Sequence, residues 1–157
     1  MPNLLHVYQR GEDFKVTRSD KKTVVYNVEY KKLSTRADFK FLEPDGSVRG
    51  FVKGGEILGS QFSILGPNEQ KLGSLQLNRS SNLEYTMQIK FMGLEYKVKD
   101  HSKGHSVDIK TMDGNLKFTI DKKILHIRDS YLVHKYEEID DFLPSSICII
   151  LDVIYHP

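Results

Sequence analysis

The sequence predicts a mainly β fold, in which about twelve antiparallel strands close into a barrel around one hydrophobic helix at the C-terminal end. Three observations predict it. Most of the chain consists of short segments in which apolar and polar residues alternate, each ended by a turn signal after roughly 6 to 10 residues. The alternation then stops at a single apolar segment without a period of two. The length of 157 residues suits one hydrophobic core, so we expect one domain over 1–157.

Composition excludes several classes of protein. The 23 basic and 21 acidic residues leave a formal net charge of +2, which lacks the overall positive field of a nucleic-acid binder, so any anion site must be a local cluster. The single cysteine, Cys148, excludes an intramolecular disulfide and a cysteine zinc cluster and favours a reducing compartment. No apolar run of signal-peptide length precedes Arg10, so we expect a cytoplasmic protein.

The first half of the chain reads as successive hairpins. Residues 13–18 and 23–31 form the first, with Val24, Tyr26, Val28 and Tyr30 on one face of the second strand. The pattern restarts at 38–41 and returns at 48–52, and it restarts again at 61–64 before a turn at 66–68. Asp45-Gly46 supplies the positive φ angles that a tight two-residue turn needs.

The second half allows the register to be counted across short turns. If Met92-Gly93 is a two-residue turn, Phe91 faces Leu94, Lys90 faces Glu95 and Ile89 faces Tyr96. An opposite-charge pair then lies on the solvent side and an apolar pair lies inside.

If Asp113-Gly114 is likewise a turn, Ile109 faces Phe118 and Lys110 faces Lys117 on the solvent side. Like charges directly opposite each other cost a few tenths of a kcal/mol, so this pair is either tolerated in solvent or marks a weak anion site. A last hairpin joins 124–127 to 131–136 through 128–130. Six hairpin-like pairs give about twelve strands, within about residues 6–136, and so many strands must close into a barrel or fold into a sandwich.

The apolar segment from about 140 to 155 reads as one helix. Glu138, Asp140 and Asp141 suit the positive end of a helix dipole, and Pro144 is tolerated in a first turn. The apolar residues point in nearly every direction, which predicts a helix buried on all sides. This predicted core consists of Phe142, Leu143, Ile147, Cys148, Ile149, Ile150, Leu151, Val153 and Ile154.

Length decides between a membrane span and a helix enclosed by protein. At 1.5 Å per residue the helix is about 21 Å long, short of the roughly 30 Å hydrocarbon core of a bilayer. Asp152 opposes insertion further. A barrel of twelve strands has a lumen too wide for its own side chains, so we expect the helix to fill it and the chain not to be transmembrane. Asp152 then needs partners: it either bonds to the barrel near the helix end or marks an exit exposed to solvent or ligand.

The order of these features resembles the tubby C-terminal-like superfamily, and in particular its small single-domain members related to the plant LURP-one proteins, the bacterial YxjI-type proteins and the phospholipid scramblases. The resemblance rests on the order of the strands and on the terminal helix. It is carried by Asp13-Phe14-Lys15-Val16, Asp38-Phe39-Lys40-Phe41, the segment RDSYLV at 128–133 and the segment IILDVI at 149–154.

The resemblance implies a twelve-stranded barrel around a central helix. It also implies binding of anionic phospholipid head groups, because tubby proteins hold phosphoinositides through basic residues. We name Lys31, Lys32, Arg36, Lys110 and Lys117 as candidate anion or phospholipid contacts, with solvated surface residues as the alternative. The calcium-dependent lipid movement assigned to scramblases does not carry over, since YLVHKYEEIDD at 131–141 lacks alternating oxygen ligands around a glycine turn.

Other chemistry finds little support in the sequence. His101 and His105 are close along the chain, but they fall in a predicted turn and are expected to be surface residues. His126 and His134 are expected at ordinary wall positions. Cys148 lies within the buried helix and cannot act as a nucleophile there. No hydrolase, phosphate-loop or dinucleotide motif occurs. We therefore expect no catalytic residue, no cofactor and no metal.

The leading hypothesis is a non-enzymatic binding or scaffold domain that recognises anionic phospholipids at a membrane surface, or a protein partner, and does not bind nucleic acid. The alternative is an intracellular barrel that carries a small apolar ligand, which a helix in the lumen opposes. An enzyme would need a cleft of converging titratable groups that the sequence does not display.

Overall fold

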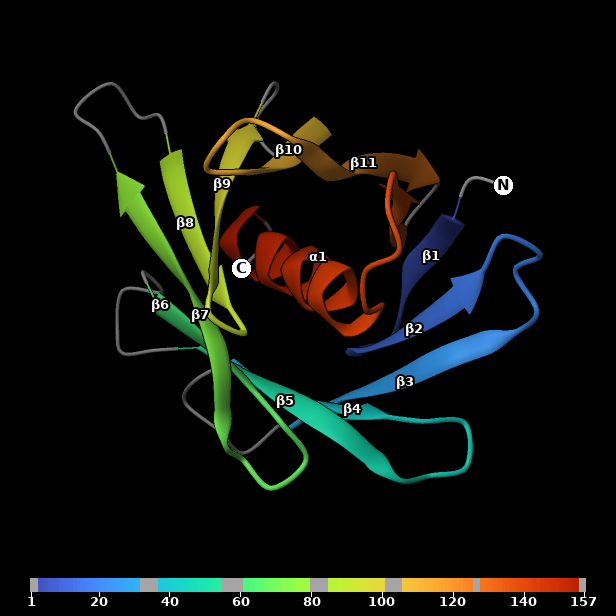
Figure 1. The fold of residues 1–157 in the computed structure, drawn as a ribbon. Helices are drawn as coiled ribbons and strands as arrows, with labels where there is room; N and C mark the ends of the chain where they lie inside the picture. Colours follow the sequence, from blue (N-terminus) through green and yellow to red (C-terminus); the bar gives the residue numbers. More distant parts are fainter. Residues whose placement is uncertain are drawn as a thin grey trace.

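The computed structural model describes residues 3–31, 37–54, 61–79, 85–100, 106–125 and 128–155. Twelve antiparallel strands form a closed barrel around one helix, as the sequence predicts (Figure 1). Each strand pairs with its neighbours in the chain, and β1 pairs with β12 to close the wall. The strands are β1 (Asn3–Arg10), β2 (Asp13–Arg18), β3 (Val24–Tyr30), β4 (Asp38–Leu42), β5 (Val48–Gly54), β6 (Gln61–Leu65), β7 (Lys71–Arg79), β8 (Tyr85–Phe91), β9 (Leu94–Asp100), β10 (Ser106–Thr111), β11 (Leu116–Leu125) and β12 (Arg128–Lys135).

The count of twelve strands is confirmed, although two of the strands differ from the expected ones. β11 runs without a break from Leu116 to Leu125, and β12 begins at Arg128, inside the segment predicted as a turn. The additional strand is β1, which pairs with both β2 and β12. Alternation is weak in β1 because apolar residues point both ways: Leu5 and Val7 are buried, whereas Leu4 and Tyr8 lie half-buried on the outer face.

The register across Met92-Gly93 is confirmed. Phe91 faces Leu94, Lys90 faces Glu95, and Ile89 faces Tyr96. Lys90 Nζ lies 3.7 Å from Glu95 Oε1 on the outside. Met92 and Gly93 both have positive φ angles, 51° and 81°, as a two-residue hairpin turn requires.

The register predicted across Asp113-Gly114 is only half right. Ile109 faces Phe118 as predicted, but the register then shifts and Lys110 faces Leu116 instead of Lys117. The Gly114 N–H donates to Thr111 O, and only Gly114 of the pair has a positive φ angle, so the loop holds three residues instead of two. The loop at Asp45-Gly46 has the same hydrogen-bond pattern. The extra residue forms a bulge, which separates Lys117 from Lys110.

Helix α1 (Phe142–Tyr155) lies along the lumen of the barrel (Figure 1). The predicted core residues from Phe142 to Leu151 are at most 3% exposed, while Val153 and Ile154 are half-buried at the C-terminal end. The Phe142 ring packs edge-on against Phe41, with centroids 5.1 Å apart. Among the described residues, no helix has the length and apolar character needed to cross a membrane.

Candidate functional site

The five predicted anion contacts do not form one site. Lys31 is exposed and follows β3, and its N–H donates to Asp38 O. Lys110 is the second-last residue of β10 and Lys117 is the second residue of β11. Because neighbouring strands are antiparallel, the end of β3 and the β10–β11 turn lie at opposite ends of the barrel. Lys32 and Arg36 lie outside the described residues.

Lys117 is paired with an acid. Its Nζ lies 2.5 Å from Glu137 Oε2, and the Lys117 side chain is 21% exposed. The hydrogen bond to Glu137 raises the pKa of Lys117. This neutralised cation is therefore a poor anchor for an external anion.

Lys110 does face another lysine, and that lysine is Lys97 on β9. Directly opposed residues have Cβ atoms about 4.5–5.5 Å apart, so the two ammonium groups share one patch of the outer wall. Along the same wall Lys99 faces Asp108, and Lys90 forms its ion pair with Glu95. Lys90, Lys97 and Lys99 are exposed and Lys110 is half-buried. We call these four residues the lysine face.

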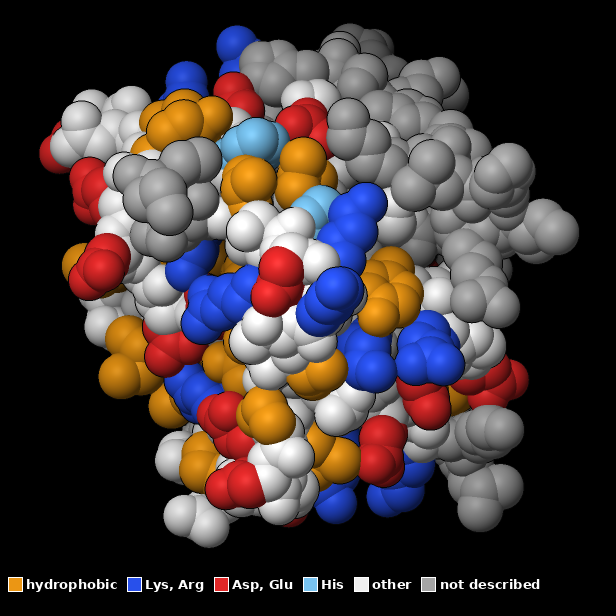
Figure 2. Space-filling view, turned by 90° about the vertical axis from the view of Figure 1, so that its right-hand side faces the viewer, with side chains coloured by type: hydrophobic (Ala, Val, Ile, Leu, Met, Phe, Trp, Pro, Cys, Tyr) orange, Lys and Arg blue, Asp and Glu red, His pale blue; other side chains and the backbone are white. Residues whose placement is uncertain are grey.

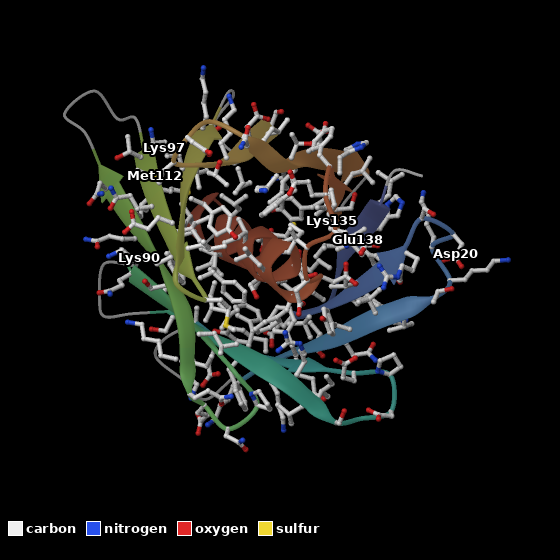
Figure 3. All side chains as sticks on the ribbon, viewed as in Figure 1. Asp20, Lys90, Lys97, Met112, Lys135 and Glu138 are labelled. Carbon is white, nitrogen blue, oxygen red and sulfur yellow. The ribbon has the colours of Figure 1, made fainter. Side chains whose placement is uncertain are left out.

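The lysine face lies apart from the β1–β3 side of the barrel. Figure 3 shows Lys90 and Lys97 on one side of the molecule, with Asp20 on the other. The side over β1–β3 intermixes Lys and Arg with Asp and Glu (Figure 2). The lysine face differs from this mixed surface because two of its lysines, Lys97 and Lys110, lie directly opposite each other on neighbouring strands.

A second cluster of charges lies where the helix enters the barrel. Lys135 points inward from β12, with its side chain 6% exposed, and its Nζ forms an ion pair with Asp141. Arg18 lies 2.9 Å from the other oxygen of Asp141, and Arg49 lies 2.8 Å from Asp140. Asp140 Oδ1 in turn accepts a hydrogen bond of 2.7 Å from the Phe142 N–H. This cluster fixes the start of α1 to the wall. Of the three acids expected at the helix N-terminus, Asp140 bonds to a helix N–H, Asp141 pairs instead with cations of the wall, and Glu138 is exposed.

Sequence reasoning missed Lys135 as an inward-facing residue. The signal was present, because Lys135 has the same parity in β12 as the buried Tyr131 and Val133. A lysine at such a position is tolerated because Asp141 and the carbonyl of Ile139 accept from its Nζ.

At the other end of the helix, Asp152 is 7% exposed and its Oδ1 accepts a hydrogen bond of 2.8 Å from the Tyr131 hydroxyl. The carboxylate therefore bonds to the barrel near the helix end, through a side chain. Cys148, one turn earlier, is fully buried, and this burial raises the pKa of its thiol.

Metal and acid–base chemistry gain no support from the part of the chain that the structure describes. No group of three His, Cys, Asp or Glu residues there could hold a metal ion. His134 Nε2 lies 4.0 Å from Asp121 on the outer wall. Burial, and secondarily Lys21, lowers the pKa of His6. His101, His105 and His126 fall outside the described residues.

Comparisons with known proteins agree with this architecture. A protein from Arabidopsis thaliana, solved by X-ray crystallography, superposes with a TM-score of 0.72 at 12% sequence identity, covering 98% of this chain and 91% of that chain. At this identity the likeness shows the fold alone. No curated protein sequence matches the chain. The model of the LURP-one-related family matches residues 6–152, and the chain therefore belongs to the LURP-one-related family.

Proposed function

We propose that this protein is a non-enzymatic binding domain that recognises anionic phospholipid head groups at a cytoplasmic membrane surface, through Lys97 and Lys110 of the lysine face. The observation that carries the proposal is the direct opposition of these two lysines on the outer wall. Like charges in this position destabilise the free protein slightly, and an anion between them relieves the repulsion. The resemblance to tubby-like proteins favours a phosphate-bearing lipid as that anion.

Electrostatics sets the expected strength of the interaction. A lysine near an anionic membrane surface contributes about 1 kcal/mol of binding free energy. Replacing both Lys97 and Lys110 by neutral residues should therefore weaken binding by roughly 30-fold. Salt should weaken binding as well, since the lysine face is exposed.

Vesicle flotation tests the proposal. The protein should float with vesicles of phosphatidylcholine mixed with phosphatidylserine and remain behind with phosphatidylcholine alone. The Lys97→Gln/Lys110→Gln variant should lose this preference. A matched control, Lys15→Gln/Lys40→Gln, removes the same charge from half-buried lysines on β2 and β4 and should keep it. If both variants lose the preference for anionic vesicles equally, the net charge of the protein explains the binding, and the lysine face is not a specific site.

A single reversed charge separates function from stability. Lys110→Glu places an acid opposite Lys97, which should stabilise the fold by about 0.2–1 kcal/mol in urea denaturation. The same variant should bind anionic vesicles less well than the wild type. A gain in stability with unchanged vesicle binding would mean that the lysine pair is simply tolerated.

The alternative, a barrel that carries a small apolar ligand, is opposed by the filling of the lumen. The side chains of Phe142, Ile147 and Ile150 are 0% exposed within the wall, so the helix takes the volume that such a ligand would need. Native mass spectrometry of the purified protein checks this. A co-purified apolar molecule at one copy per chain would favour the carrier over the proposed function.

A further inference from the structure

Four large hydrophobic side chains are exposed among the residues whose side chains the structure describes, and all four lie at one end of the barrel. They are Met92 at 66%, Leu94 at 59%, Met112 at 52% and Tyr136 at 58%. Met92 and Met112 occupy the β8–β9 and β10–β11 turns, Leu94 begins β9, and Tyr136 follows β12. Because β8 to β12 are successive neighbours in the barrel, these residues form one arc, which we call the apolar rim.

Backbone hydrogen bonds connect both ends of the apolar rim to the wall. The Met92 N–H donates to Leu72 O at 2.9 Å, and the Tyr136 N–H donates to Lys117 O at 3.0 Å. These hydrogen bonds tie the backbone at both ends of the arc to neighbouring strands.

Local structure does not account for Met92. Its φ angle of 51° lies in the left-handed region, where turns of this type favour Asn, Asp or Gly. Its side chain also gains little from packing, since 66% of it is exposed. Met92 therefore contributes little to the stability of the turn, and together with the other three residues it forms an exposed apolar group of the kind that marks contact surfaces.

Charge identifies the kind of surface that fits. Lys90, Lys97 and Lys110 lie on the outer wall directly behind the turns, and Figure 3 shows Met112 on the same side as Lys90 and Lys97. Two of the acids near the apolar rim are paired, Glu95 with Lys90 and Glu137 with Lys117, while Asp113 and Glu138 are exposed carboxylates that would have to face away from the bilayer. Apolar tips backed by long, flexible cations match the boundary of an anionic bilayer, where the tips reach the acyl region and the lysines extend to the phosphates.

We propose that the apolar rim inserts into the interface of an anionic bilayer, so that the barrel stands with the N-terminal end of α1 toward the membrane. This inference rests on the proposed function, and it adds a hydrophobic contact and a fixed orientation to the binding of head groups. Methionine suits this role because its flexible side chain adapts to an irregular apolar surface.

The absence of tryptophan from the sequence makes insertion directly measurable. Met112→Trp and Leu94→Trp each introduce the only tryptophan. With vesicles of phosphatidylcholine and phosphatidylserine, the tryptophan fluorescence of both variants should shift to shorter wavelengths and be quenched by brominated lipid. Asn27→Trp, at an exposed position on the outer wall of β3, is the control and should do neither.

A second measurement removes the apolar contact and keeps the charges. The Leu94→Ser/Met112→Ser variant should bind anionic vesicles at least about tenfold more weakly than the wild type. Its far-ultraviolet circular dichroism should be unchanged, because both side chains are exposed.

The outcomes separate the two proposals. Vesicle binding with no shift at either rim tryptophan overturns insertion and leaves the head-group proposal standing. No binding to anionic vesicles overturns both. A wild-type dimer in sedimentation that Leu94→Ser/Met112→Ser converts to a monomer also overturns insertion, because the apolar rim is then an interface between two copies.

Discussion

Replacing Gly50 by alanine should destabilise the barrel through a steric conflict between the wall and the helix. Gly50 lies on the inner face of β5, beside the ring of Phe142 at the start of α1. A Cβ atom added at Gly50 would lie 2.2 Å from Leu65 O and 2.6 Å from Phe142 Cζ. Neither group can move easily. The Leu65 carbonyl belongs to the paired β6 backbone, and the Phe142 ring is held by Phe41 and by Arg49, whose Cζ lies 4.4 Å from the ring centroid.

Overpacking of this kind costs about 1–3 kcal/mol or more, and the contact with a backbone oxygen places Gly50→Ala toward the upper end. For a domain of this size, that cost lowers the melting temperature by about 2–4 °C per kcal/mol. Urea denaturation followed by circular dichroism measures the free energy of unfolding directly. A Gly50→Ala variant within about 0.5 kcal/mol of the wild type would refute the reasoning.

Two companion variants identify the source of the loss. Gly46→Ala, in the exposed β4–β5 turn, has nothing within 4 Å of the added Cβ but a φ angle of +90°, so it should cost only the strain of the backbone, about 1 kcal/mol. Adding Phe142→Leu to Gly50→Ala relieves one of the two close contacts. The double variant should therefore lose less stability than the sum of the two single variants.

Three further predictions concern buried and charged groups. Lys135→Met should lower the free energy of unfolding in urea by about 2–4 kcal/mol. The loss is somewhat smaller than for a fully broken buried ion pair, because Asp141 keeps Arg18 as a partner. An unchanged free energy of unfolding would show that Lys135 makes no net contribution to stability. Cys148 should react with thiol reagents only at the rate of unfolding, because burial raises its pKa and blocks access, and prompt labelling of the native protein would contradict its placement. Hydrogen bonds, first that from the Thr23 side chain, lower the pKa of Asp20 from 3.8 to about 2. The wild type should therefore be more stable than Asp20→Ala, with the full difference in the free energy of unfolding present above pH 3.8 and lost as the pH falls through about 2. If the difference persists in stronger acid, the Asp20 carboxylate is not its cause.

The closed barrel limits where this protein can bind a partner. Full closure removes the strand edges on which many sheets add a peptide, and the helix occupies the lumen. The outer wall and the two ends remain available. The lysine face and the apolar rim are adjacent parts of that remaining surface, so the membrane contact that we propose would engage both.

Much of the fold follows from local patterns in the sequence. Alternation of apolar residues and turn signals predicts the strands, because a strand that buries one face must place every second side chain inside. The turn at Met92-Gly93 is short enough to set the register by itself, so the facing of Lys90 and Glu95 could be counted without a structure. The position of the helix also follows from the sequence, because a helix that is apolar on all sides and too short to span a bilayer must be enclosed by the rest of the protein.

The tertiary structure decided which charged residues meet. Lys97 and Lys110 lie on strands joined by a connection of more than two or three residues, and such a connection does not fix the register of the strands that it joins. The bulge after Ile109 moved Lys117 away from Lys110, and it depends on how the loop closes at Gly114. Lys135 meets Asp141 because the short segment after β12 turns back and places the start of the helix inside the wall. Closure couples the tilt and stagger of all twelve strands at once, so these contacts depend on the whole wall, whereas a sequence pattern reports only on neighbours along the chain.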